Sequence, residues 1–234
     1  MPTPHPSPPP PFVSETAGPR KGWLVLEGAA LFLGLPGAVA AGWIRAWVIP
    51  LLILTALGCG LVLRRSHGIR LRDLIRPRVP AGEWRRVLLI FAVAVPVLVM
   101  LLGFVQLSAR FSLLRTQPGL WLLVVVLYPV VSVVPQEFIY RAFFFTRYRP
   151  LFGGGWGLPL ASALMFAFGH LVFHNWPAVV LAGAGGWLFG LTYRRTSSLL
   201  LVSAEHALYG CAIFTIGYGE FFFDGTLRVV RGGP

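Results

Sequence analysis

Charge is scarce in this sequence, and lysine is almost missing from it. Only 12% of the 234 residues are charged, and Lys21 is the only lysine. Aspartate and glutamate together number 8, against 20 lysine and arginine residues. An ordinary soluble domain carries about twice this share of charged residues. The composition therefore excludes a typical soluble domain.

Cysteine is equally scarce, with only 2 in the chain. Cys59 and Cys211 both lie within apolar runs. A buried thiol in such a setting usually behaves as a small hydrophobic side chain. We therefore expect neither a disulfide nor a metal site made of cysteines.

Most of the sequence consists of long apolar runs. Hydrophobic residues make up 56% of the chain, and its mean hydropathy is +0.73. Runs of about 20 apolar residues are long enough to cross a bilayer as helices. The sequence predicts an all-α fold, a polytopic membrane helical bundle of about seven (six to eight) transmembrane helices. The expected spans are 23–44, 47–63, 87–107, 121–148, 156–173, 178–193 and 199–216.

The chain divides into one membrane domain and two short tails. A proline-rich segment over 1–19 is predicted to be disordered. A transmembrane domain is expected over 20–217 and a C-terminal tail over 218–234. No second globular domain is expected.

Arginine accounts for nearly all of the net charge of +12. It is densest in the short segment 64–86 between two apolar runs, and such loops stay in the cytoplasm. We therefore attribute the charge to topology beside membrane lipids, with no nucleic-acid partner. The pattern predicts an integral protein of the cell inner (plasma) membrane with a cytoplasmic N-terminus.

A few polar residues lie inside apolar sequence, where charge is costly and marks function or a specific partner. Glu137 and Arg141 are four residues apart, so they share a helix face and can neutralise each other. His170 and His206 lie in two later spans. A carboxylate and two histidines meeting in a partly dry cavity provide what water activation needs. The alternative is a structural Glu–Arg pair with histidines that only pack.

Two further glutamates are predicted to lie outside this cluster. Glu27 is near the entrance of the first span and is expected to be interfacial. Glu205 is about 100° around the helix from its neighbour His206. We expect it to be interfacial or turned to another neighbour.

Three ordered motifs carry a resemblance to a known family. They are Gln136-Glu137-Phe-Ile-Tyr-Arg141, Phe166-Ala-Phe-Gly-His170 and His206-Ala-Leu-Tyr-Gly210. Over about 120–215 the chain resembles the CAAX-type prenyl endopeptidases and bacteriocin-processing proteins, the intramembrane CPBP or Abi group. That family shows Glu-Glu-x-x-x-Arg, Phe-x-x-x-His and His-x-x-x-Asn or Asp on successive helices.

The resemblance implies an intramembrane endopeptidase that cleaves a peptide bond of a membrane-associated peptide or protein substrate. Glu137 is then the general base, and His170 is its partner in positioning water. His206 stabilises the oxyanion, and Arg141 keeps Glu137 ionised. No cofactor is favoured.

Two positions depart from the family pattern. Gln136 replaces the leading glutamate, which is thought to act with the first histidine as the base. Gly210 replaces the closing Asn or Asp, so the side chain thought to help hold the oxyanion is missing. Three interpretations follow from these departures. Glu137 supplies the base, or the fold has become a non-catalytic binder, or the chemistry differs.

Three alternatives stay open from the sequence. A metalloprotease would bind zinc through Glu137, His170 and His206. A catalytically inactive membrane scaffold would bind a partner protein or a lipid-modified peptide. A transporter would use the glutamate and histidines to relay protons. The substrate, the cleavage site and the oligomeric state have no signature in the sequence.

Overall fold

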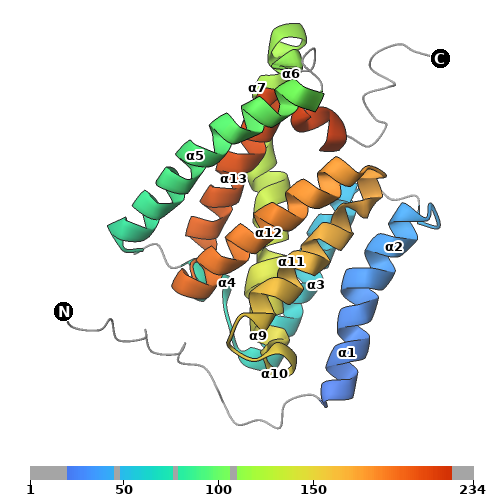
Figure 1. The fold of residues 1–234 in the computed structure, drawn as a ribbon. Coiled ribbons are helices and arrows are strands. Elements are labelled where there is room, and N and C mark those ends of the chain that lie inside the picture. Colours follow the sequence, from blue (N-terminus) through green and yellow to red (C-terminus); the bar gives the residue numbers. More distant parts are fainter. Residues whose placement is uncertain (1–19, 45–47, 76–78, 106–109, 223–234) are drawn as a thin grey trace.

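The structure, a computed structural model, describes residues 20–44, 48–75, 79–105 and 110–222. The predicted tail 1–19 and residues 223–234 lie outside the described part. The described residues form helices and loops and contain no strand, so the predicted all-α bundle is confirmed (Figure 1).

The helices follow one another in the order of the predicted apolar runs, with several of them interrupted by short π-helical or 3₁₀ segments. In chain order they are α1 (Lys21–Ala29), η1 (Ala30–Gly34), α2 (Leu35–Ala40), α3 (Val48–His67), α4 (Leu71–Ile75), α5 (Ala81–Val105), α6 (Ser112–Thr116), α7 (Pro118–Tyr128), η3 (Pro129–Val133), α8 (Val134–Glu137), η4 (Phe138–Phe143), α9 (Phe144–Arg147), α10 (Arg149–Phe152), α11 (Gly157–Gly169), η5 (His170–Phe173), α12 (Trp176–Thr196), α13 (Leu199–Ile216) and η6 (Tyr218–Phe222).

Five helices of the described part are long and apolar enough to cross a membrane. They are Lys21–Ala40, Val48–His67, Ala81–Gly103, Pro118–Arg147 and Leu199–Ile216. The predicted fifth span corresponds to the shorter apolar helix Gly157–Phe173. The predicted sixth span corresponds to the glycine-rich α12, which is not among these five apolar helices. The bundle therefore combines full-length apolar helices with shorter or less apolar ones.

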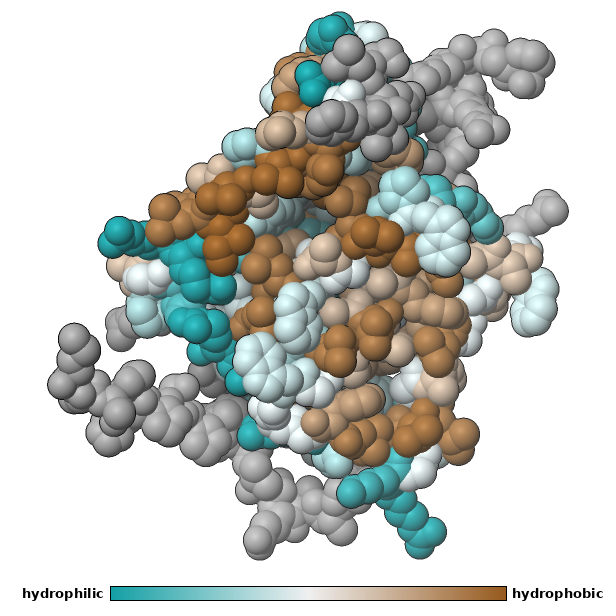
Figure 2. All heavy atoms as spheres, viewed as in Figure 1, coloured by the Kyte–Doolittle hydropathy of each residue, from teal (hydrophilic) through white to brown (hydrophobic). Residues whose placement is uncertain are grey.

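The outer surface of the bundle is apolar. Figure 2 shows hydrophobic side chains spread over the face that α5 presents, with hydrophilic ones gathered toward the ends of the bundle. Large exposed side chains include Leu89, Val93, Val97, Met100 and Val126. Exposed apolar area of this extent marks a surface that faces lipid. The protein is thus an integral membrane protein.

The predicted fourth span is one 30-residue helix, Pro118–Arg147. The backbone stays helical through Pro129 and Pro135 and widens into two π-helical stretches, η3 and η4. A proline lacks the N–H for the usual i→i−4 bond, and π turns often occur at functional sites. These stretches flank Gln136 and Glu137.

Small residues bring α11 and α12 close together. A Cβ placed on Gly186 would lie 3.2 Å from the backbone Cα of Ala163 and 3.1 Å from the ring of Phe166. A Cβ on Gly190 would lie 3.4 Å from Pro159. Small residues at such contacts let helix backbones approach in a membrane. The close approach sets the position of Phe166, which lies at the centre of the site described below.

Replacing Gly186 by leucine is expected to destabilise the fold. The added side chain would meet backbone of α11 that cannot move aside, and overpacking of this kind costs about 1–3 kcal/mol. The midpoint of thermal unfolding in detergent should fall accordingly. Gly58→Leu is the matched control, because a Cβ on Gly58 meets nothing within 4 Å. Equal midpoints for the two variants would contradict the tight contact.

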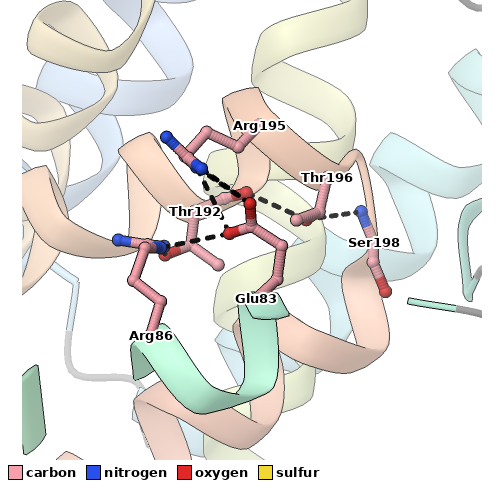
Figure 3. A network of polar contacts seen from close by, with 6 residues as sticks. All are labelled: Glu83, Arg86, Thr192, Arg195, Thr196 and Ser198. Carbon is pink, nitrogen blue, oxygen red and sulfur yellow. Dashed lines mark hydrogen bonds and ion pairs between the residues drawn. The ribbon is translucent and has the colours of Figure 1, made fainter. Parts of the chain in front are cut away.

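A polar network ties the start of α5 to the end of α12 (Figure 3). Glu83 accepts from the guanidinium of Arg195 at 2.7 Å and from Nε of Arg86 at 3.1 Å. Arg86 also donates to the hydroxyl of Thr192. These bonds place the arginines of both helices at one end of the bundle. That arrangement agrees with the basic-loop pattern, while the side of the membrane on which it lies stays a prediction.

Candidate active site

Glu137 and Arg141 form a fully buried ion pair in the middle of the long fourth helix. Both have 0% exposed side chains, and Nε of Arg141 lies 3.1 Å from Oε2 of Glu137. The guanidinium also donates to the carbonyl of Gly186 at 3.1 Å. It lies 4.7 Å from the ring centroid of Phe166 and 5.6 Å from that of Phe189. The carboxylate is therefore neutralised from one side by a guanidinium that aromatic faces hold in place.

His206 of α13 completes the charge arrangement. Its Nδ1 lies 2.7 Å from Oε1 of Glu137. An ionised carboxylate only accepts hydrogen bonds, so Nδ1 carries the proton. Nε2 points the other way, 3.1 Å from the hydroxyl of Tyr128. The imidazole that contacts the carboxylate of Glu137 is that of His206, while the role of His170 in positioning water stays a prediction.

His170 lies where α11 gives way to the 3₁₀ turn η5. Its Nδ1 is 2.8 Å from the carbonyl oxygen of Phe166, which can only accept, so this nitrogen also carries the proton. In the neutral ring Nε2 then carries a lone pair that can accept a proton or a hydrogen bond. His170 is half-buried, more accessible than His206. Of the two histidines it is therefore the one that a water molecule can reach more readily.

Phe166 brings the two histidines together. Its ring centroid lies 4.6 Å from that of His170 and 5.6 Å from that of His206. The spacing of the second motif predicted that Phe166 and His170 would share a helix face, and their rings do touch. On the other side, Phe189 stacks on His206 at 4.7 Å with an interplanar angle of 20°. The two imidazoles are thus held around one aromatic ring.

Gln136 and Gly210 occupy the positions that depart from the motifs. The side-chain amide of Gln136 donates to the hydroxyl of Ser132 at 2.7 Å. Its Oε1 is buried and has no hydrogen-bond partner within the described residues. At Gly210, the ring of Tyr128 fills the place of a side chain. Sequence reasoning missed Tyr128, although it is the one ring with a hydroxyl in the aliphatic run that precedes the first motif.

The two other glutamates differ in how they match their predictions. Glu27 pairs with Arg147 at 2.9 and 2.7 Å and accepts from the hydroxyl of Tyr148 at 3.1 Å. It fixes α1 against the end of the long helix, away from the histidines. Glu205 is 0% exposed and is turned toward Thr192, one of the two predicted possibilities.

No group of three or more His, Cys, Asp or Glu side chains is arranged to hold a metal ion within the residues that the structure describes. Glu137, His170 and His206 are thus not grouped as one ligand set, and the zinc alternative stays a prediction. Nδ1 of each histidine has an acceptor, so Nε2 is the nitrogen that would bind a metal. The absence of a required metal stays a prediction.

An apolar groove of about 940 Å³ opens beside the helices that carry Tyr128 and His206. Its walls come from α5, α7 and α13. They include Trp84, Phe91, Trp121, Val125 and Leu208. A groove of this lining suits hydrocarbon rather than polar ligands.

An all-helical bundle with a buried Glu–Arg–His cluster and a second histidine defines an integral membrane protein with a candidate hydrolytic site. Residues 118–212 match the family model described as type II CAAX prenyl endopeptidase Rce1-like. The matched range includes all three motifs, so the resemblance drawn from them is confirmed. No curated protein matches the chain, and no solved structure does.

Proposed function

We propose that the protein is an intramembrane endopeptidase of the CAAX-protease type, with water activated by a histidine. The observation that carries this function is the 2.7 Å contact between Nδ1 of His206 and the buried carboxylate of Glu137. A carboxylate on Nδ1 fixes the tautomer and the orientation of an imidazole. The match to the Rce1-like family over 118–212 supports the reaction class.

Glu137 is assigned the role of anchor in this mechanism, in place of the general base that the family resemblance implied. Its side chain is fully buried, Oε1 accepts from His206, and Oε2 faces Arg141. A base must come within hydrogen-bond reach of the water it activates. Glu137 instead holds His206 in one tautomer and orientation, and Arg141 keeps the carboxylate ionised.

His170 is assigned the proton transfer. Its Nδ1–H is held by the carbonyl of Phe166, so Nε2 accepts a proton from water. The hydroxide oxygen then bonds to the scissile carbonyl carbon, and the C–N bond breaks. The proton on Nε2 passes to the departing amine nitrogen. Oε1 of Gln136, which has no hydrogen-bond partner among the described residues, supplies an acceptor that can orient the water.

His170→Gln is expected to abolish cleavage of a quenched-fluorescence peptide that ends in a farnesylated CAAX sequence. Loss of a positioned acid–base group lowers kcat by about 10²- to 10⁴-fold. His174→Asn is the matched control, because His174 is exposed and its φ of 55° is a conformation that asparagine tolerates. Full activity of the His170 variant would exclude its role in proton transfer. A wild-type protein that leaves the peptide intact would exclude this substrate class.

The same purified protein tests the zinc alternative. We expect less than stoichiometric zinc by total metal analysis, and cleavage that survives a chelator. Stoichiometric zinc that is lost in His170→Ala would replace the histidine mechanism by a metal site.

Binding without cleavage is the second candidate function. Gln136 favours it, because an amide cannot take a proton from water at neutral pH, and the family motif has a carboxylate there. Membranes from cells with intact protein are compared with membranes carrying His170→Gln. An uncut precursor that accumulates only in the variant supports the protease. A partner that is retained equally by both proteins, without any precursor, supports the binding function.

A further inference from the structure

Tyr128 and Gly210 fit each other across two helices. Tyr128 is the last residue of α7, and Gly210 lies on α13. A Cβ placed on Gly210 would overlap Cε1 of the tyrosine ring and lie 2.6 Å from its hydroxyl oxygen. Any side chain at 210 would therefore displace the ring. The missing side chain at this motif position makes room for the phenol.

The hydroxyl of Tyr128 lies at Nε2 of His206, the ring nitrogen that does not face Glu137. Its oxygen lies 3.1 Å from Nε2. Since Nδ1–H is donated to Glu137, Nε2 of the neutral ring is an acceptor, and the phenol donates to it. The edge of Phe214 packs against the tyrosine ring, with centroids 5.2 Å apart. The phenol is therefore held in place by packing as well as by its hydrogen bond.

We propose that Tyr128 is a positioning residue of the site, which supplies from α7 the polar group that residue 210 lacks. Its hydroxyl holds Nε2 of His206 in place, while Glu137 holds Nδ1. The imidazole is then held at both nitrogens and stacked on Phe189. This role rests on the proposed function, since it acts through His206.

Tyr128→Phe tests the hydroxyl without removing the ring. We expect kcat for the farnesylated peptide to fall about tenfold, the value of one hydrogen bond, with KM nearly unchanged. Gly210→Ala should reproduce the loss, because its Cβ takes the space of the phenol. Tyr148→Phe is the control, since it removes the hydrogen bond of a phenol to Glu27 at the residue just after the same long helix. It should cleave as wild type does.

A second measurement reads the hydrogen bond without any substrate. In protein with ¹⁵N-labelled histidine, the Nε2 resonance of His206 is assigned by its loss in His206→Gln. We expect it to move in Tyr128→Phe and to stay in Tyr148→Phe. The double variant Tyr128→Ala/Gly210→Asn makes room for an amide at 210 and should recover part of the lost kcat, which a purely structural role would not allow.

The outcomes separate this inference from the proposed function. If wild type cleaves the peptide and Tyr128→Phe cleaves it equally well, Tyr128 has no positioning role and the protease function stands. If wild type does not cleave, that function fails for this substrate, and the nitrogen spectrum decides. An Nε2 resonance unchanged by Tyr128→Phe then overturns the inference, and a shifted one upholds the contact.

Discussion

Glu137→Gln is expected to lower kcat, with an upper limit on the order of 10⁴-fold, the loss seen when the carboxylate that orients a proton-transferring histidine becomes an amide. The amide has one accepting oxygen where the carboxylate has two, so it can serve either Nδ1–H of His206 or the guanidinium of Arg141, and its NH₂ group faces the other donor. Loss of the bond to Nδ1–H misplaces Nε2. Cleavage of the farnesylated peptide, normalised to folded protein, measures the loss.

The same substitution should also destabilise the protein. It leaves the guanidinium of Arg141 buried without a counter-charge, and breaking a buried pair in this way costs about 3–5 kcal/mol. The double variant Glu137→Gln/Arg141→Met removes both charges and should recover most of the stability. It should stay inactive. Thermal unfolding in detergent, measured beside cleavage, separates the two effects.

Glu27→Gln is the matched control for both measurements. It breaks another Glu–Arg pair, that with Arg147, which lies outside the histidine cluster. Stability should fall while the activity per folded molecule stays unchanged. A Glu137→Gln protein as stable and as active as wild type would remove Glu137 from the site altogether.

The helices and the Glu–Arg pair are predictable because they depend on local sequence. Apolar runs of bilayer length place the helices, since every backbone polar group must be paired within a helix in lipid. The four-residue spacing of Glu137 and Arg141 places both on one face wherever the helix goes. Tertiary contacts cannot change these relations. The ion pair therefore occurs as the spacing predicted.

Which histidine contacts Glu137 depends instead on how two helices are rotated relative to each other. The residue spacing within one helix gives no information about this rotation. For that reason the sequence could not show that the imidazole of His206 would contact Glu137. Glu205 turns inward because α13 packs on several sides, as its many buried residues show. Tyr128 is found only when the vacant place at Gly210 is seen in three dimensions.

Gln136→Glu tests whether the first motif position still belongs to the site. The present amide donates to Ser132, and a carboxylate of the same shape can accept from that hydroxyl instead. It would also bring a general base to the half-buried position where Oε1 now has no hydrogen-bond partner among the described residues. Because such a base contributes about 10²- to 10⁴-fold, we expect kcat to rise by about 10²-fold on the farnesylated peptide.

Gln117→Glu is the control for this last substitution, with the same chemical change at the N-cap of α7. A carboxylate is favoured near a helix N-terminus, so this variant should fold well and cleave as wild type does. Cleavage gained by Gln136→Glu from a wild type with none would mean that the native chain binds without cutting and that a single carboxylate separates it from a protease. A folded Gln136→Glu protein with unchanged kcat would place residue 136 outside the water site, and the proton transfer would then belong to the histidines alone.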